Sequence, residues 1–65
     1  MSHRIDETAV LKAASEWAER TGRNTETVSS TAQDVMVRLK SKLTASEYQG
    51  ALKQLHGQYK RDNVS

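Results

Sequence analysis

Apolar residues recur along this chain at the three- and four-residue spacing of amphipathic helices. In the first segment, at about 100° per residue, a narrow arc is formed by Val10, Ala14, Trp17 and Ala18. A second stripe, with Met36 at its edge, is formed by Val28, Ala32, Val35, Leu39 and Leu43. A third face carries Tyr48, Ala51, Leu52, Leu55 and Tyr59. The pattern predicts a mainly α fold with three short helices, at about residues 7–20, 25–42 and 45–60.

Signals for helix ends lie between these stripes. Gly22 follows the first stripe and can take the left-handed conformation that ends a helix without a Cβ penalty. Asn24 or Thr25 can then accept free amide protons and begin the second helix. Thr44 and Glu47 have the spacing of a capping box, which predicts the start of the third helix.

The first six residues are ambiguous between a strand and a helix cap. Apolar and polar residues alternate there as in a short strand, with Met1, His3 and Ile5 against Ser2, Arg4 and Asp6. Alternatively, Ser2 or Asp6 caps the first helix. Ile5 lies roughly 140° from Val10 on the helical wheel, so a buried Ile5 would not belong to the first turn of that helix. At the other end, residues 62–65 are expected to form a flexible tail.

Composition limits how much core the chain can build. It has 65 residues, no Cys and no Phe, and 35% of its residues are hydrophobic. We therefore expect a single small helical domain over residues 1–65, completed by homodimerisation or by a protein partner. No apolar run approaches membrane-spanning length and no signal peptide is evident. This predicts a cytoplasmic protein without membrane association, and the small size suggests a bacterial or phage origin.

The net charge of +2 conceals an asymmetry between the two halves of the chain. Residues 1–37 carry four basic and six acidic side chains, whereas residues 38–61 carry six basic side chains against Glu47 alone. A basic C-terminal half can meet nucleic acid or an acidic protein surface, or it can be a solvated lysine-rich surface.

Residues that could support catalysis are scattered. His3 and His56 have no carboxylate or Cys at ligand spacing. Glu16 and Glu19 lie one turn apart, but no apolar pocket is evident that would raise the pKa of either. We expect no enzymatic activity, no metal, no cofactor and no small-molecule substrate.

Three segments together resemble the ribbon-helix-helix family, whose members are small dimeric DNA-binding repressors and antitoxins. The segments are Arg4-Ile5-Asp6, Trp17-Ala18-Glu19-Arg20 and the run from Thr21 to Val28, Thr-Gly-Arg-Asn-Thr-Glu-Thr-Val. The resemblance covers about residues 2–40. It implies two N-terminal strands that pair across a dimer and enter the DNA major groove.

The same resemblance assigns roles to individual residues. Ser2 and Arg4 would read base edges, and backbone amides around Asn24 and Thr25 would hold a phosphate. Trp17, together with Val28 and Ala32, would belong to the dimer core. The third helix would be an addition to the family fold, such as the toxin-binding arm of an antitoxin.

The alternative is an all-helical regulator that inhibits a partner protein by docking a helix. One version resembles the short antitoxins of Fic adenylyltransferases, whose inhibitory helix carries Ser or Thr four residues before Glu. Ser15 and Glu19 have that spacing, with Arg20 where Gly or Asn is expected. The residues predicted to contact a partner are Ser15, Trp17 and Glu19 on the first helix and Tyr48, Leu52, Leu55 and Tyr59 on the third. Both interpretations predict a non-enzymatic regulator whose target is DNA or a protein.

Overall fold

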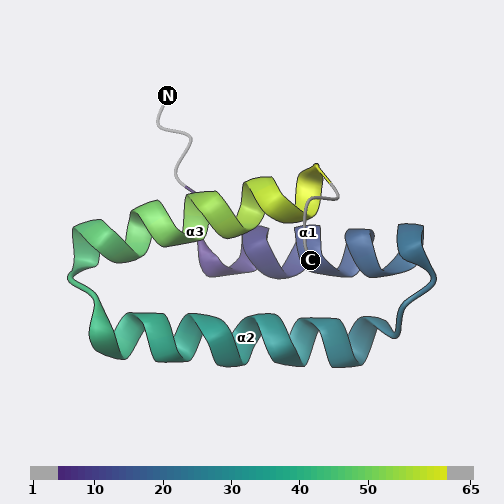
Figure 1. Cartoon of the computed structure of the whole chain (residues 1–65), viewed down its shortest axis with the longest axis horizontal. Coiled ribbons are helices and arrows are strands. Elements are labelled where there is room, and N and C mark those ends of the chain that lie inside the picture. The colour runs from purple at the N-terminus through teal and green to yellow at the C-terminus, as the bar shows by residue number, and fades with distance from the viewer. Residues whose placement is uncertain (1–4, 62–65) are drawn as a thin grey trace.

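The computed structural model describes residues 5–61, which form three helices connected by short turns (Figure 1). The helices are α1 (Glu7–Thr21), α2 (Thr25–Lys42) and α3 (Ala45–Lys60). α2 runs back along α1, and α3 reverses direction again, so that α3 lies parallel to α1 (Figure 1). The predicted mainly α fold is confirmed, and each predicted helix is present with its ends within one residue.

The turn between α1 and α2 is built by Gly22. Gly22 has φ 72° and ψ 24°, the left-handed conformation that was expected of it. The Arg23 amide donates to the Ala18 carbonyl at 2.7 Å and the Gly22 amide to the Glu19 carbonyl at 3.3 Å. These two bonds form a Schellman motif, which satisfies carbonyls that the end of a helix would otherwise leave free.

Side chains cap the N-termini of the two following helices. The Asn24 Oδ1 atom accepts from the Thr27 amide at 3.0 Å, so Asn24 rather than Thr25 is the cap of α2. In α3 the Glu47 amide donates to Thr44 Oγ1 at 3.3 Å, and the Thr44 amide donates to Glu47 Oε1 at 3.0 Å. The predicted capping box is therefore present, and it fixes where α3 begins.

The N-terminus of α1 shows which interpretation of the first six residues holds for Ile5 and Asp6, the two that the structure describes. Asp6 Oδ1 accepts from the Ala9 amide at 2.8 Å, which makes Asp6 the N-cap of α1. Ile5 is half-buried against the core and precedes the helix, as its position on the wheel predicted. Within residues 5–61 there is no strand. The chain enters α1 directly after Asp6. The remainder of the predicted strand, residues 1–4, and the predicted tail, residues 62–65, lie outside the described residues.

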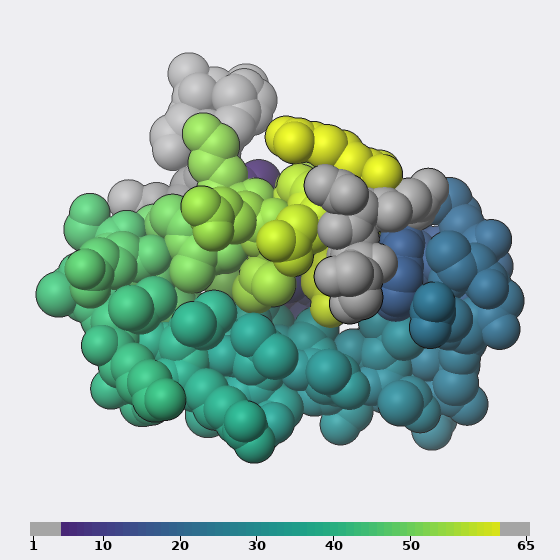
Figure 2. All heavy atoms as spheres, in the orientation of Figure 1, coloured from purple at the N-terminus to yellow at the C-terminus, as the bar shows by residue number. Residues whose placement is uncertain are grey.

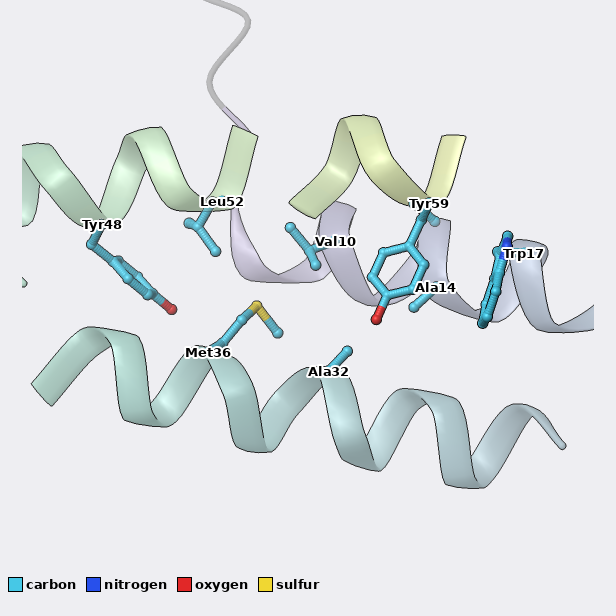
Figure 3. Close-up of a cluster of buried hydrophobic side chains, with 9 residues drawn as sticks. Val10, Ala14, Trp17, Ala32, Met36, Tyr48, Leu52 and Tyr59 are labelled. Atoms are coloured by element: carbon cyan, nitrogen blue, oxygen red, sulfur yellow. The ribbon is translucent and has the colours of Figure 1, made fainter. Parts of the chain in front are cut away.

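All three helices contribute to one apolar core within a single chain (Figure 3). α1 lies against both other helices, and α2 and α3 contact each other less than either contacts α1. No polar or charged residue of the described part is buried. The buried side chains are Val10, Ala13, Ala14, Trp17 and Ala18 of α1, Ala32 and Met36 of α2, and Tyr48, Leu52 and Tyr59 of α3. The expected need for a second chain to complete the core stays a prediction.

The buried stripe of α2 differs from the predicted one. Met36, predicted at the edge of the stripe, is 2% exposed, whereas Val35, predicted within it, is 36% exposed. On the helical wheel Met36 and Val35 lie on opposite sides of Ala32. Because α2 packs mainly on α1, the side that carries Met36 is covered and the side that carries Val35 remains partly open.

Candidate functional site

The solvent side of α3 carries a hollow lined by polar and cationic side chains. α3 buries Tyr48, Leu52 and Tyr59, so residues about half a turn away from these point to solvent. Figure 2 shows a side chain from the yellow end of α3 extending along the upper edge of the molecule. The hollow has a volume of about 380 Å³ and opens to solvent. We call it the α3 hollow, and it is lined by Lys53, Gln54, Gly57, Gln58 and Arg61.

Gly57 and Arg61 determine the shape of the α3 hollow. A Cβ atom at position 57 would lie 3.6 Å from Nη2 of Arg61. The guanidinium group therefore folds back over Gly57, one turn closer to Lys53 than the Arg61 backbone. The Arg61 amide donates to the Gly57 carbonyl at 3.0 Å and fixes the base of this side chain. The two cations of the hollow thus face the same open space.

The charged side chains that line the α3 hollow in the described part of the chain, Lys53 and Arg61, are both cations. Residues 48–61 contain no Asp or Glu, and three exposed cations lie among them: Lys53, Lys60 and Arg61. In contrast, the cation Arg38 on α2 pairs with Asp34 at 3.2 Å, with both side chains largely exposed. Within residues 48–61 no acidic side chain offsets these cations, so a negatively charged ligand would be attracted there.

The C-terminal ends of α1 and α3 meet at Trp17. Its ring lies 5.5 Å from that of Tyr59, measured between centroids, and the Arg23 guanidinium carbon lies 4.8 Å from the Trp17 centroid. Arg20 Nη2 donates to the Tyr59 carbonyl oxygen at 2.8 Å. Because α1 and α3 run parallel, the negative ends of their dipoles lie together, and the two arginines offset this charge. This cation–π and hydrogen-bonded cluster stabilises the fold.

At its other end α3 is held by a hydrogen bond to the first turn of α1. The Tyr48 hydroxyl donates to Glu7 Oε2 at 2.5 Å. Burial, the hydrogen bond to Glu7 and the charge of Glu7 together raise the pKa of Tyr48 to about 12. Burial also raises the pKa of Tyr59. Both tyrosines thus favour their neutral form in the folded chain and serve packing.

The residues predicted to contact DNA are not brought together by the described part of the structure. Ser2 and Arg4 lie outside residues 5–61. The Asn24 side chain is engaged as the cap of α2, where it accepts from the amide of Thr27. Thr25, the first residue of α2, is half-buried. One of the amides at this helix start is thus already satisfied within the chain.

The apolar residues predicted to contact a partner lie in or beside the core of the chain itself. Trp17, Tyr48, Leu52 and Tyr59 are between 1% and 8% exposed, and Leu55 is half-buried against the same core. Figure 3 shows these four buried side chains between the helices. Their stripe is therefore covered by the chain's own helices.

Ser15 and Glu19, the pair at inhibitory-helix spacing, lie in different environments. The Ser15 hydroxyl is 3.0 Å from the Ser29 hydroxyl of α2, where it forms a hydrogen bond in a partly buried position. Glu19 is exposed. A partner that approached Glu19 would find the Ser15 hydroxyl already bonded across the α1–α2 contact.

Groups suited to metal binding do not gather in residues 5–61, which hold no cluster of three or more His, Cys, Asp or Glu side chains. His56 is half-buried on α3. None of the helices in this part of the chain combines the length and apolar character needed to cross a membrane.

None of the five residues that line the α3 hollow was among the predicted site residues. Two signals in the sequence could have indicated them. The stretch from residue 48 to residue 61 lacks acids, and Lys53, Gly57 and Arg61 recur at the four-residue spacing of one helix face. The apolar stripe that predicts contacts for α3 lies on the opposite side of the same helix.

Comparison of the chain with models of protein families, with curated protein sequences and with solved structures finds no match. The case for a function therefore depends on the geometry and charge described above.

Proposed function

We propose that this protein is a non-enzymatic regulator that binds DNA through the solvent side of α3. One observation carries the proposal: cations and amides gather around the α3 hollow, within a stretch of helix that contains no acidic residue. A DNA duplex presents a dense row of phosphates, and neutralising them with Lys and Arg releases counterions and drives binding. Glutamine amides add hydrogen bonds to phosphates or base edges.

The shape of the site is compatible with a duplex. An α-helix fits the major groove of B-form DNA. The exposed residues of α3 include Lys53, Gln54 and Gln58, whose side chains face solvent rather than another helix. This mode of contact differs from the paired strands of a ribbon-helix-helix dimer, and it requires no residue outside the described part of the chain.

The test is the salt dependence of DNA affinity, measured by fluorescence anisotropy with a labelled duplex of mixed sequence. With three phosphate contacts, log K should fall against log salt with a slope of about −3. Replacing Lys53, Lys60 or Arg61 by Gln should each weaken binding and reduce the slope by about 1. The matched control is Lys12→Gln, which removes the same charge from an exposed position on α1.

Two results would contradict the proposal. One is the absence of salt-sensitive binding by the intact chain. The other is an equal loss for Lys12→Gln and for the α3 substitutions, because attraction would then follow net charge and not the α3 surface.

A further inference from the structure

We infer that the α3 hollow is a phosphate-binding site, in which Lys53 and Arg61 hold one phosphate of the DNA backbone over Gly57. This inference rests on the proposed function and specifies its central contact. The same five residues would bind any phosphate group that can reach the hollow. The ligand recognised is therefore a phosphate, either as the dianion or as a diester. Gln54 and Gln58 supply amide N–H donors at the rim.

The positions of the cations favour convergence on one anion. Lys53 and Arg61 are eight residues apart, which places their backbones about 12 Å apart along the helix axis. Because the Arg61 side chain folds back over Gly57, its guanidinium lies closer to Lys53 by about half of that distance. The flexible Lys53 side chain can span the remainder, since both residues line the same hollow.

Gly57 keeps this space open. A glycine inside a helix is less favourable than alanine, because its backbone loses more conformational freedom on folding. Any side chain longer than alanine at position 57 would extend into the α3 hollow, where the nearest neighbour of a Cβ atom is the Arg61 side chain. Gly50 is also exposed on α3, but a Cβ atom there would meet nothing within 4 Å. The two glycines therefore form a natural pair of test site and control.

The helix dipole opposes an anion at this end of α3, so the local charges must outweigh it. The end of a helix carries about half a negative charge. Lys53 and Arg61 line the hollow with two positive charges, and the Tyr59 carbonyl oxygen already accepts from Arg20. Among the described residues that line the hollow every charge is positive, which favours a phosphate.

The experiment compares Gly57→Leu with Gly50→Leu in the anisotropy assay, with circular dichroism to verify that both remain helical. Leucine favours helix more than glycine does, and neither substitution changes a charge. Gly57→Leu should weaken DNA binding about tenfold and reduce the salt slope by about 1, as expected for one lost phosphate contact. Gly50→Leu should change neither.

The outcomes distinguish a failure of the phosphate site from a failure of DNA binding. If Gly57→Leu binds like Gly50→Leu while Lys53→Gln and Arg61→Gln weaken binding, the phosphate site is overturned and DNA binding stands. If the intact chain binds no DNA, the hollow is tested with inorganic phosphate by NMR. A saturable shift of the Gly57 amide, lost in Arg61→Gln, would then support a phosphate site without DNA, and no shift would overturn it.

Discussion

At the scale of single residues, glycine has opposite consequences at two positions of this chain. Gly22 sits at φ 72°, where L-residues with a Cβ atom are strained. Gly50 lies inside α3 with ordinary helical geometry and open space around it. The same atom, a Cβ, is therefore unfavourable in the turn and favourable in the helix.

This contrast predicts changes of opposite sign. Gly22→Ala should lower the free energy of unfolding by about 1 kcal/mol, because alanine must adopt the left-handed conformation. Gly50→Ala should raise it by about 0.5–1 kcal/mol, because the unfolded chain loses conformational freedom and the helix gains propensity. Urea denaturation of both variants measures the two effects. Equal shifts of the same sign would contradict the assignment of Gly22 as the cap of α1.

Tyr48 predicts how stability depends on alkaline pH. In the unfolded chain a tyrosine loses its proton near pH 10, whereas in the folded chain the pKa of Tyr48 is about 12. Between these values the unfolded state binds fewer protons, so the free energy of unfolding falls as pH rises. The stabilisation is fully present below pH 10 and is lost as pH passes 12.

Denaturation of wild type and Tyr48→Phe from pH 8 to pH 12 measures this dependence. The variant should show a shallower fall above pH 10, and part of the fall should remain because the pKa of Tyr59 is also raised. At pH 8 the variant should be less stable by about 1 kcal/mol, since its hydrogen bond to Glu7 is lost. Identical alkaline slopes in the two proteins would show that Tyr48 does not couple folding to pH.

At the scale of elements, α2 shows what the periodicity of apolar residues can and cannot predict about a helix. The sequence pattern predicted the helix and its general apolar side, and it left the N-cap open between Asn24 and Thr25. It did not establish whether Met36 or Val35 is central, because both lie within about 60° of Ala32 on the wheel. That choice depends on which neighbouring helix covers α2, and this is a property of the tertiary packing.

Substitutions of Met36 and Val35 should therefore have very different effects on the free energy of unfolding. Met36→Ala should lower the free energy of unfolding by about 2–5 kcal/mol, since Met36 is 2% exposed in the core. Val35→Ala should cost under about 1 kcal/mol, because its side chain is already 36% exposed and alanine favours helix. Thermal and urea unfolding measure both. A larger loss at Val35 would restore the originally predicted stripe and contradict the packing of α2 on α1.

At the scale of the whole molecule, the features that the sequence predicts are those set by residues close together in the chain. Gly22, Asp6 and the Thr44–Glu47 pair act through neighbours in sequence, so the three helices and their ends could be predicted. The covering of Trp17 by Tyr59 joins residues far apart in the chain, and no local pattern specifies it. For the same reason, the sequence does not show that the apolar stripe on α3 packs within its own chain, or that the α3 hollow lies on the opposite side of the helix.

The attachment of α3 at both of its ends bears on the thermodynamics and kinetics of recognition. Glu7 bonds to Tyr48 and Arg20 to Tyr59 across separations of 41 and 39 residues, so α1 orders both ends of α3 before any ligand arrives. A ligand that binds the α3 hollow then pays no entropy for folding the helix. Under the proposed function, its association would be a collision with a preformed cationic surface, whose rate would depend on diffusion and ionic strength and not on a conformational step.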